Sequence, residues 1–475
     1  MKQQKLKRVL CGLLVVCLLV SCAGMTGCSG ATSAAVEPME PEEVNTLTFD
    51  LIGGKDVMPI SGYYSPARSK YFYNGESQPD MITDEYFKMI AESGINLLNQ
   101  SYVDYNAYPD DVFATLDLGE KYGVGIFVND PIVTGALGEK TMSLAAMAER
   151  VSEYANHPAF CGMYGCDEPQ WHGFYLGDGT RTIDMYAPSM QRLAELGIVV
   201  YANALPDNFM DDGGVKYTAY LNEMLDKFQS PYLSFDAYMW DANYPGLSRY
   251  FYNLGINRQV AQERNLPLWS FIQCGSQWND SMSRFDSVTP YYPDEGQFQW
   301  SVNVNLAYGV QGIEYFTIIQ PNYFAWAESE PFDFERNGMI GAWGNKNRWY
   351  YYAQTVNKQI AAVDEVLMHA KNKGVIVTSK QGQIDNALSS AILEGESWRE
   401  LVSVDGDAMI GCFNYQGKTA LYVVNYDYEY AQDITLHFNN KHNVSVTYDA
   451  ETAHYNAKDL TLKMQCGRGA LVVFD

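Results

Sequence analysis

Eight short apolar runs recur between residues 59 and 317, and stretches with helical periodicity separate them. The runs cover 59–64, 95–101, 124–130, 160–168, 198–205, 232–238, 267–273 and 312–317. Short runs that are apolar throughout are typical of strands buried on both faces of a parallel sheet. Eight strand-then-helix units in series are what a closed parallel barrel requires, so the sequence predicts a (β/α)8 TIM barrel over residues 47–372.

The stretches between the runs have the features of amphipathic helices. One is expected to begin at Thr83, with Asp84 and Glu85 in its first turn, and another at Ser143. A last helix is expected over about 348–371. An open doubly wound sheet is the alternative fold, but the sequence contains neither GxGxxG nor GxxxxGK[ST]. The number of units also favours the barrel.

After residue 372 the pattern changes to short alternating segments separated by turn residues. The segments are 401–404, 419–426, 434–438, 444–448 and 469–474, and the turn pairs are Asp405-Gly406, Gln416-Gly417 and Asn439-Asn440. This pattern predicts an all-β module over 373–475, most simply an antiparallel sandwich. We expect it to serve as a structural cap on the barrel rather than as a binding module.

The N-terminus has the pattern of a secretory signal. Basic residues up to Arg8 precede an apolar run over 9–20, which is too short to span a bilayer. The run ends at Ser21-Cys22, which resembles the lipobox of bacterial lipoproteins. We therefore expect a signal peptide over 1–21 and lipid attachment at Cys22; Cys28 is a poorer candidate for attachment.

Residues 22–46 are rich in Ser, Ala, Pro and Glu and contain no aromatic residue, so a flexible tether is expected there. Together with the lipobox, this predicts an exported protein that is lipid-anchored to the bacterial cell membrane and faces outside. An ordinary secretory peptide with an incidental cysteine is the alternative.

Charge and cysteine spacing exclude several functions. The chain has 57 acidic and 32 basic residues, a net charge of −25 that repels nucleic-acid phosphates. The cysteines are scattered without the spacing of a disulfide framework or a metal site, and the six histidines form neither HxH nor HExxH. We expect no metal, no other cofactor, no nucleotide and no nucleic-acid partner.

Polar residues end the predicted strands, at the end of the barrel where active sites form. They are Tyr63, Tyr64, Asn99, Asn129, Asp130, Asp167, Glu168, Asn203, Asp236, Tyr238, Gln273, Tyr315 and Thr317. The set contains carboxylates, amides and phenols but no His, Lys or Arg. Such groups offer both donors and acceptors to a neutral polyhydroxylated ligand, so a carbohydrate is the expected partner.

The fourth run carries the most specific motif. His157-Pro158-Ala159-Phe160 leads through an apolar strand into Asp167-Glu168-Pro169. This motif resembles strand four of the (β/α)8 glycoside hydrolases, especially those of clan A, in which Asn-Glu-Pro carries the general acid/base. Residues 299–321 are similar to a region of bacterial β-galactosidase-like proteins. The resemblance covers about residues 59–372 and implies that Glu168 is the general acid/base.

The chemistry of glycoside hydrolysis favours Glu168 independently. The reaction needs a carboxylic acid that protonates the leaving oxygen, close to aromatic groups that exclude water. A surface salt bridge is the structural alternative for this residue. Asp167 takes the place of the family's Asn and can accept a hydrogen bond from a sugar hydroxyl but cannot donate one. It can instead orient a neighbouring loop.

The second carboxylate is where the sequence departs from clan A. Strand seven ends in Gln273 where the family has its nucleophilic glutamate, and glutamine can neither form the glycosyl ester nor deprotonate water. Asp236 is the first alternative and Glu314 the second; each can instead be a satisfied polar residue of the barrel. A Glu168–Asp236 separation of about 5 Å would fit a retaining mechanism, and roughly 6.5–9.5 Å an inverting one.

Aromatic residues in the loops after the strands can stack on sugar rings. They are Trp171, Tyr175, Trp240, Tyr244, Trp278, Tyr323 and Trp326; packing in the core is the structural alternative for each. The complete set predicted to bind substrate is Asp167, Tyr63, Asn99, Asn129, Asn203, Tyr238, Trp240, Gln273, Tyr315 and Trp326.

The sequence therefore predicts an extracellular glycoside hydrolase acting on an oligo- or polysaccharide. Gln273 keeps a second hypothesis open, a non-catalytic carbohydrate-binding lipoprotein derived from a glycosidase. A cell-surface scaffold without a sugar site is the third.

Overall fold

The computed structural model describes residues 36–69, 79–136, 141–169, 180–207, 213–240, 246–275, 292–320, 337–378 and 391–475. Residues 36–475 belong to one unit. The predicted signal peptide, together with Cys22 and Cys28, lies outside the described residues. Within these ranges, the structure contains no helix that is both long and apolar enough to cross a bilayer.

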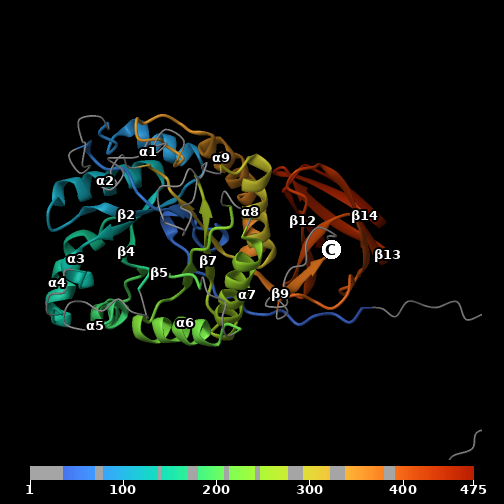
Figure 1. Cartoon of the computed structure of the whole chain (residues 1–475), viewed down its shortest axis with the longest axis horizontal. Helices are drawn as coiled ribbons and strands as arrows, with labels where there is room; N and C mark the ends of the chain where they lie inside the picture. The colour runs from blue at the N-terminus through green and yellow to red at the C-terminus, as the bar shows by residue number, and fades with distance from the viewer. Residues whose placement is uncertain are drawn as a thin grey trace, which may run out of the picture. The chain divides into compact units, whose positions relative to one another are not determined.

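All eight predicted runs form parallel strands of one barrel sheet (Figure 1). The strands are β1 (Ile60–Gly62), β2 (Leu97–Asp104), β3 (Gly125–Asn129), β4 (Phe160–Asp167), β5 (Val200–Ala204), β6 (Leu233–Phe235), β7 (Leu268–Gln273) and β8 (Gly312–Phe316). Their order is β1-β8-β7-β6-β5-β4-β3-β2, and at the seam the Asn96 amide donates to the Ile60 carbonyl at 3.0 Å. The predicted (β/α)8 barrel is confirmed.

Helices follow the strands around the barrel (Figure 1). They are α1 (Asp84–Glu92), α2 (Pro109–Tyr122), α3 (Pro131–Thr134), α4 (Leu144–Ala155), α5 (Thr182–Glu195), α6 (Val215–Phe228), α7 (Leu247–Glu263), α8 (Glu295–Ala307), α9 (Arg348–Ile360) and α10 (Asp364–Met368). The 3₁₀ turns η1 (Asp50–Ile52) and η2 (Gly54–Asp56) precede β1. Ser143 caps α4 by accepting from the Ala146 amide at 3.2 Å, so the predicted start of this helix is confirmed.

The helix expected over 348–371 is wrong in its second half. It ends at Ile360, the short α10 follows, and strand β9 (Ala370–Val377) begins where the helix was expected to finish. The side chain of Asn372 donates to the Ala307 carbonyl at 2.9 Å, and Ile376 enters the core of the C-terminal domain. These long-range contacts override the local helical pattern.

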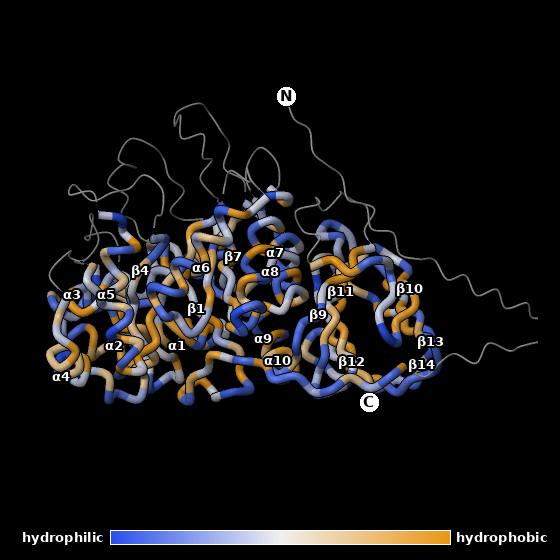
Figure 2. Tube along the Cα trace, turned by 90° about the horizontal axis from the view of Figure 1, so that it is seen from below, coloured by the Kyte–Doolittle hydropathy of each residue, from blue (hydrophilic) through white to orange (hydrophobic). Residues whose placement is uncertain are grey.

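The C-terminal domain is an antiparallel sheet. Its strands are β9, β10 (Leu401–Asp405), β11 (Ala408–Tyr415), β12 (Lys418–Asn425), β13 (Gln432–Tyr448), β14 (Glu451–Met464) and β15 (Gly469–Phe474), in the order β10-β13-β15-β12-β11-β9 with β14 beside β13. Strands β11 and β12 consist mainly of hydrophobic residues, whereas hydrophilic residues dominate β14 (Figure 2). One cluster of buried residues from all seven strands forms the core.

The turn predicted at Asn439-Asn440 is wrong. Both residues lie inside the continuous strand β13, which joins the predicted segments 434–438 and 444–448. The pairing with β14 shifts register between His437 and His442. An irregularity of this kind lets polar residues interrupt the alternation without ending the strand.

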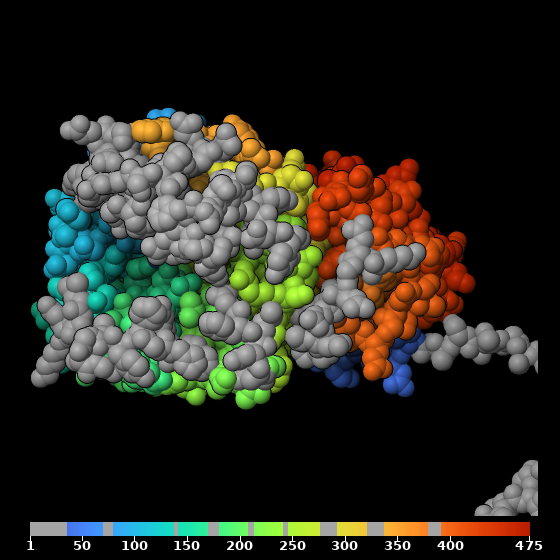
Figure 3. All heavy atoms as spheres, viewed as in Figure 1, coloured from blue at the N-terminus to red at the C-terminus, as the bar shows by residue number. Residues whose placement is uncertain are grey.

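Helix α8 packs between the barrel and the C-terminal domain. Its residues from Gly296 to Ala307 are all buried, and the orange and red atoms of the domain lie against the yellow part of the chain in Figure 3. The side chain of Asn303 donates to the Gly467 carbonyl at 3.0 Å and accepts from the Tyr422 hydroxyl at 2.6 Å. Gly411 sits so close to the helix that an added Cβ would lie 2.3 Å from the Ala307 carbonyl oxygen.

The described part of the predicted tether is held against the body. Asn414 donates to the Glu40 carbonyl at 2.7 Å, and Lys373 forms an ion pair with Glu42 at 2.9 Å. Further along, Phe49 packs edge-on against Phe127 of β3, with ring centroids 5.7 Å apart. Residues 36–46 therefore differ from the flexible segment expected over 22–46.

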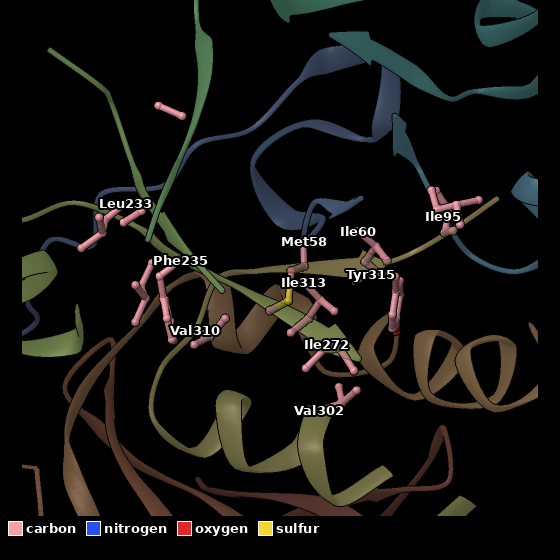
Figure 4. Packing of buried hydrophobic residues seen from close by; sticks show 14 of the residues in the cluster. Met58, Ile60, Ile95, Leu233, Phe235, Ile272, Val302, Val310, Ile313 and Tyr315 are labelled. Atoms are coloured by element: carbon pink, nitrogen blue, oxygen red, sulfur yellow. The ribbon is translucent and has the colours of Figure 1, made fainter. Parts of the chain in front are cut away.

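Hydrophobic packing fixes the strands from inside and outside. Inside the barrel, a cluster comprises Leu97, Phe127, Tyr201, Tyr232, Trp269 and Phe271. Outside, Ile272 of β7 and Tyr315 of β8 lie close to Val302 of α8 (Figure 4). The carboxyl ends of the strands are thus held on a rigid frame.

Candidate active site

The end of β4 presents two adjacent carboxyl groups. Asp167 pairs with Asn203 of β5, and the Glu168 amide donates to the Asn203 carbonyl at 3.0 Å. Glu168 has a φ of 46°, in the left-handed region that non-glycine residues rarely adopt. Such a conformation costs about 1–3 kcal/mol and occurs preferentially at functional sites.

Glu168 and Asp236 form a hydrogen-bonded pair of carboxyl groups. Asp236 follows β6 directly and is 7% exposed, whereas Glu168 is half-buried. Burial, the nearby charges of Glu168 and Asp167, and the hydrogen bond to Glu168 raise the pKa of Asp236 well above its ordinary value. Two carboxyls in contact cannot both ionise readily, so the pair gives up its last proton less easily than an isolated carboxyl does.

Asn203 connects this pair to Asp167. Its side-chain amide donates to Asp236 Oδ1 at 2.8 Å and lies 3.4 Å from Asp167 Oδ1. Asp167 also accepts from the Tyr201 hydroxyl at 3.2 Å and from the Tyr63 hydroxyl. Although Asp167 is open to solvent on one side, the surrounding protein desolvates it and raises its pKa, while the three hydrogen bonds oppose this shift.

Glu314 lies inside the barrel, below this pair. It is completely buried, and its Oε1 accepts from the Ser61 hydroxyl at 2.9 Å and from the Asn99 amide at 3.3 Å. Its Oε2 lies 2.6 Å from the hydroxyl oxygen of Ser234. Burial raises the pKa of Glu314 to about 7, against the effect of these hydrogen bonds.

Gln273 is engaged entirely with the backbone. Its amide nitrogen donates to the carbonyls of Trp240 at 2.9 Å and Gly275 at 2.8 Å, and its oxygen accepts from the Trp240 amide at 3.3 Å. The side chain is 4% exposed. Gln273 thus ties the segment after β6 to the end of β7 and has no amide hydrogen left for a ligand.

Two aromatic residues predicted to bind substrate lie outside the barrel mouth. The Tyr315 hydroxyl donates to Asn357 of α9 at 2.6 Å, and its ring stacks on Phe298 with centroids 5.9 Å apart. Trp240 is 2% exposed and donates to the Ser301 hydroxyl of α8 at 2.8 Å. Both side chains are used in packing between the strands and the helices.

Of the remaining residues predicted to bind substrate, some lie at the mouth of the barrel and others do not. Asn99 is buried beside Glu314, and the Asn129 amide donates to the Ser101 carbonyl at 3.2 Å. Trp326 and the aromatic residues expected at 171, 175, 244, 278 and 323 lie outside the described residues. Tyr63, Asp167, Glu168, Asn203, Asp236 and Tyr238 come together at one mouth of the barrel.

An aromatic wall adjoins the carboxyl groups and consists of Tyr63, Tyr64, Tyr102, Tyr238 and Phe316, all partly exposed. Tyr64 and Tyr102 stack with centroids 4.8 Å apart. Phe316 contacts Tyr63 and Tyr238, at centroid distances of 5.9 and 5.7 Å. Such rings offer apolar faces for the C–H groups of a sugar.

Tyr102 and Phe316 were not among the residues predicted from the sequence. Tyr102 lies beyond the expected end of its run because β2 continues to Asp104. Phe316 is on the same face of β8 as Glu314, and Tyr315 is on the other, because strand residues alternate. Applying this alternation to residues 314–316 would have selected Phe316 instead of Tyr315.

The part of the chain that the structure describes contains no group of three or more His, Cys, Asp or Glu placed to hold a metal ion. The described residues at the mouth present carboxyl, amide and phenol groups, which transfer protons and bind hydroxyls.

No family model and no curated protein matches this sequence. Solved structures of glycoside hydrolases share its fold. The GH42 β-galactosidase Gan42B aligns with a TM-score of 0.56 at 9% identity, covering 92% of this chain and 100% of that one. A catalytic mutant of Gan42B from G. stearothermophilus gives 0.55 at 10% identity, with 92% and 99% covered.

Two further β-galactosidases are also similar. The enzyme from Bacillus circulans sp. alkalophilus gives a TM-score of 0.53 at 8% identity, covering 88% of this chain and 98% of that one. The chain spans 63% of the length of the enzyme from the psychrophilic Marinomonas ef1, with 67% of this chain aligned at 10% identity and a TM-score of 0.45. The structures scoring above 0.5 establish a glycosidase-like fold for this chain.

Proposed function

We propose that the protein is a glycoside hydrolase acting on an extracellular oligo- or polysaccharide, with Glu168 as the group that protonates the leaving oxygen. The observation that carries this proposal is the hydrogen-bonded pair of Glu168 and Asp236 beside the aromatic wall. Export and lipid anchoring through Cys22 are part of the same proposal and rest on the N-terminal sequence.

The pair provides the proton donor. One proton is shared between two carboxyls, and repulsion between their charges opposes its loss. Glu168 is half-buried and Asp236 almost fully buried, so Glu168 is the member that reaches the substrate. When Glu168 gives the shared proton to the glycosidic oxygen, both carboxyls are left ionised, and the water that attacks the sugar loses a proton that restores the pair.

Asp236 does not act as an opposing carboxylate in this scheme. Retaining glycosidases separate their two carboxyls by about 5–5.5 Å and inverting ones by about 6.5–9.5 Å, to leave room for the sugar or a water. Glu168 and Asp236 are in hydrogen-bond contact, which is closer than either. Asp167 is the second carboxylate that we assign to the sugar, because it is open to solvent and is held by Tyr201 and Asn203.

Glu314 is assigned a positioning role. The Asn203 amide nitrogen faces Asp236, so its oxygen is left to accept from Ser234, at 2.9 Å. Ser234 has one hydroxyl proton, which can go to Glu314 Oε2 at 2.6 Å or to the Asn203 oxygen. Glu314 thereby fixes the Ser234 hydroxyl, which in turn orients Asn203.

The test is hydrolysis of a panel of aryl glycosides and oligosaccharides by the wild type and by Glu168→Gln. We expect turnover by the wild type and its loss in the variant, with circular dichroism and the unfolding temperature retained. Glu195→Gln, on the exposed end of α5, is the matched control and should be fully active. Turnover that survives in Glu168→Gln would overturn the assignment of the acid.

A second function is favoured by two observations. The acid pair is closer than either hydrolytic spacing, and Gln273 stands where clan A has a glutamate and is bound to the backbone. A protein that binds saccharides without cleaving them would have these features. Saturable binding without turnover across the panel would select this function.

A further inference from the structure

Arg258 of α7 is a buried cation without an acidic partner. It is 5% exposed, and both Nε and Nη2 donate to one neutral oxygen, Oδ1 of Asn372, at 2.9 and 2.6 Å. Among the described residues, no carboxylate lies within ion-pair distance of it, whereas Arg264, which caps the end of α7, pairs with Asp226 at 2.8 Å. Burial lowers the pKa of Arg258 to about 10, so the guanidinium remains charged at neutral pH.

An unsatisfied donor lies beside it. Tyr308 is 1% exposed, and its hydroxyl has no hydrogen-bond partner in the described structure. The charge of Arg258 acts directly on this hydroxyl. A buried polar group without a partner is rare, and the unpartnered Tyr308 hydroxyl lies beside a guanidinium whose acceptor is neutral, which points to a ligand that accepts hydrogen bonds.

Both residues line one small cavity of about 30 Å³, which is enough for a small ion. Lys371 of β9 also lines it, with Nζ 3.3 Å from the Asn265 Oδ1 atom. The lining contains two cations and no acidic residue, in a chain with 57 acidic and 32 basic residues. The local potential is therefore opposite in sign to that of the protein as a whole.

We propose that this cavity binds a small inorganic anion, held by Arg258, Tyr308 and Lys371. A guanidinium with free N–H groups, a phenolic hydroxyl and an ammonium are all donors, and a halide or an oxyanion accepts from each. The anion supplies the negative charge that the buried guanidinium lacks. The site is separate from the carboxyl groups of the barrel mouth and does not depend on the proposed hydrolase activity.

Because of where the cavity lies, we expect anion binding to stabilise the folded chain. The proposed ligands come from α7 (Arg258), from the end of α8 (Tyr308) and from β9 of the C-terminal domain (Lys371). An anion there joins three segments that are distant in the sequence and strengthens the junction between barrel and sheet. Because it binds only the folded chain, it raises the unfolding temperature in a saturable way.

The experiment measures thermal unfolding of the purified full chain in chloride, sulfate and phosphate. Ionic strength is held constant with the sodium salt of a bulky organic sulfonate. We expect a saturable rise in unfolding temperature with at least one of the three anions, and comparison of the three separates halide from oxyanion binding. In Arg258→Met the saturable rise should be lost. Arg264→Met, on a cation already paired, is the matched control and should keep the rise.

Tyr308→Phe removes one hydroxyl and leaves the packing intact, so it tests the site even if Arg258→Met does not fold. We expect the anion concentration at half-saturation to rise about fivefold, the effect of one lost hydrogen bond. Crystals soaked in bromide should show an anomalous peak between Arg258 and Tyr308. Two results would overturn the proposal. One is an unfolding temperature that rises linearly with anion concentration, and equally in the wild type, Arg258→Met and Tyr308→Phe. The other is ordered water, with no anomalous peak, between Arg258 and Tyr308.

Discussion

Glu168 and Asp236 share a hydrogen bond although they come from β4 and β6, and Asn203 of the intervening strand donates to Asp236 at 2.8 Å. The amide of Asn203 fixes Asp236 from one side while Glu168 contacts it from the other. Asp236 is thereby held as the buried partner of the more accessible Glu168. Its effect on the rate can therefore be measured separately from that of Glu168.

Replacing Asp236 by Asn should lower kcat by about 10- to 100-fold, because the acid loses the partner with which it shares a proton. The alkaline limb of the pH–rate profile should move to lower pH, since the like charge that opposed deprotonation of the pair is removed. Steady-state kinetics across the pH range measure both effects.

Asp117→Asn is the control for this variant, because Asp117 is on the exposed face of α2, with a side chain 75% exposed. It should leave the profile unchanged. An Asp236→Asn protein with the wild-type rate and profile would show that the pair does not supply the proton.

Glu314→Gln should change the pH dependence of stability. The pKa of Glu314 is about 7 in the folded chain, above its ordinary value, so the folded state keeps a proton that the unfolded chain releases. In the wild type this group therefore lowers stability as the pH rises from about 4.5 to 7, by up to about 3 kcal/mol. Glutamine does not titrate and can donate to Ser234 while accepting from Ser61 and Asn99.

Urea unfolding at a series of pH values tests this. The free energy of unfolding of Glu314→Gln relative to the wild type should increase between pH 4.5 and 7 and then stay level. Glu195→Gln should show no such trend. A variant that is destabilised equally at every pH would mean that the pKa of Glu314 is the same in the folded and unfolded chains, which contradicts the raised pKa on which this prediction rests.

The sequence was sufficient to predict the barrel because each strand is a compact apolar run with its own helix, and these are local signals. Strand β13 was predicted as two segments, because Asn439 and Asn440 have turn chemistry but are held in the strand by pairing with neighbours. The start of β9 was missed for the same reason: the contacts of Asn372 with α7 and α8 are long-range.

At the mouth, reading the polar residue that ends each run brought together Glu168, Asn203 and Asp236. The same rule selected Gln273 and Tyr315, whose side chains are bound by the backbone and by Asn357. Polarity at a strand end does not reveal which way the side chain is directed. Nor does it reveal that Ser234 links Glu314 to Asn203. That link joins residues of β6, β8 and β5, so it depends on how the three strands are aligned in the barrel.

Gln273→Ala should destabilise the fold by about 2–4 kcal/mol, because the buried carbonyls of Trp240 and Gly275 lose their donor. Gln273→Glu should not create a nucleophile. Its carboxylate would face two carbonyl oxygens, so this variant should be less stable at pH 8 than at pH 5, where the carboxyl can be protonated. Chemical unfolding at both pH values checks the two variants. A stable Gln273→Glu protein with increased turnover would show that Gln273 occupies a catalytic position.

The aromatic wall should contribute to binding through ring area. Tyr102→Ala removes the ring that stacks on Tyr64 at 4.8 Å and should weaken binding of an oligosaccharide by about 2- to 10-fold. Phe316→Ala should have a larger effect, because this ring contacts both Tyr63 and Tyr238. Isothermal titration in the inactive Glu168→Gln background isolates binding from turnover.

Tyr455→Ala serves as the matched control, because this tyrosine lies on β14 with 45% exposure and belongs to the C-terminal sheet. It should bind like the parent protein, since the loss of an exposed ring remote from the carboxyl groups removes no sugar contact. If Tyr102→Ala and Phe316→Ala also bind like the parent, the wall is a packing feature, and saccharide affinity has to come from the carboxyl and amide groups alone.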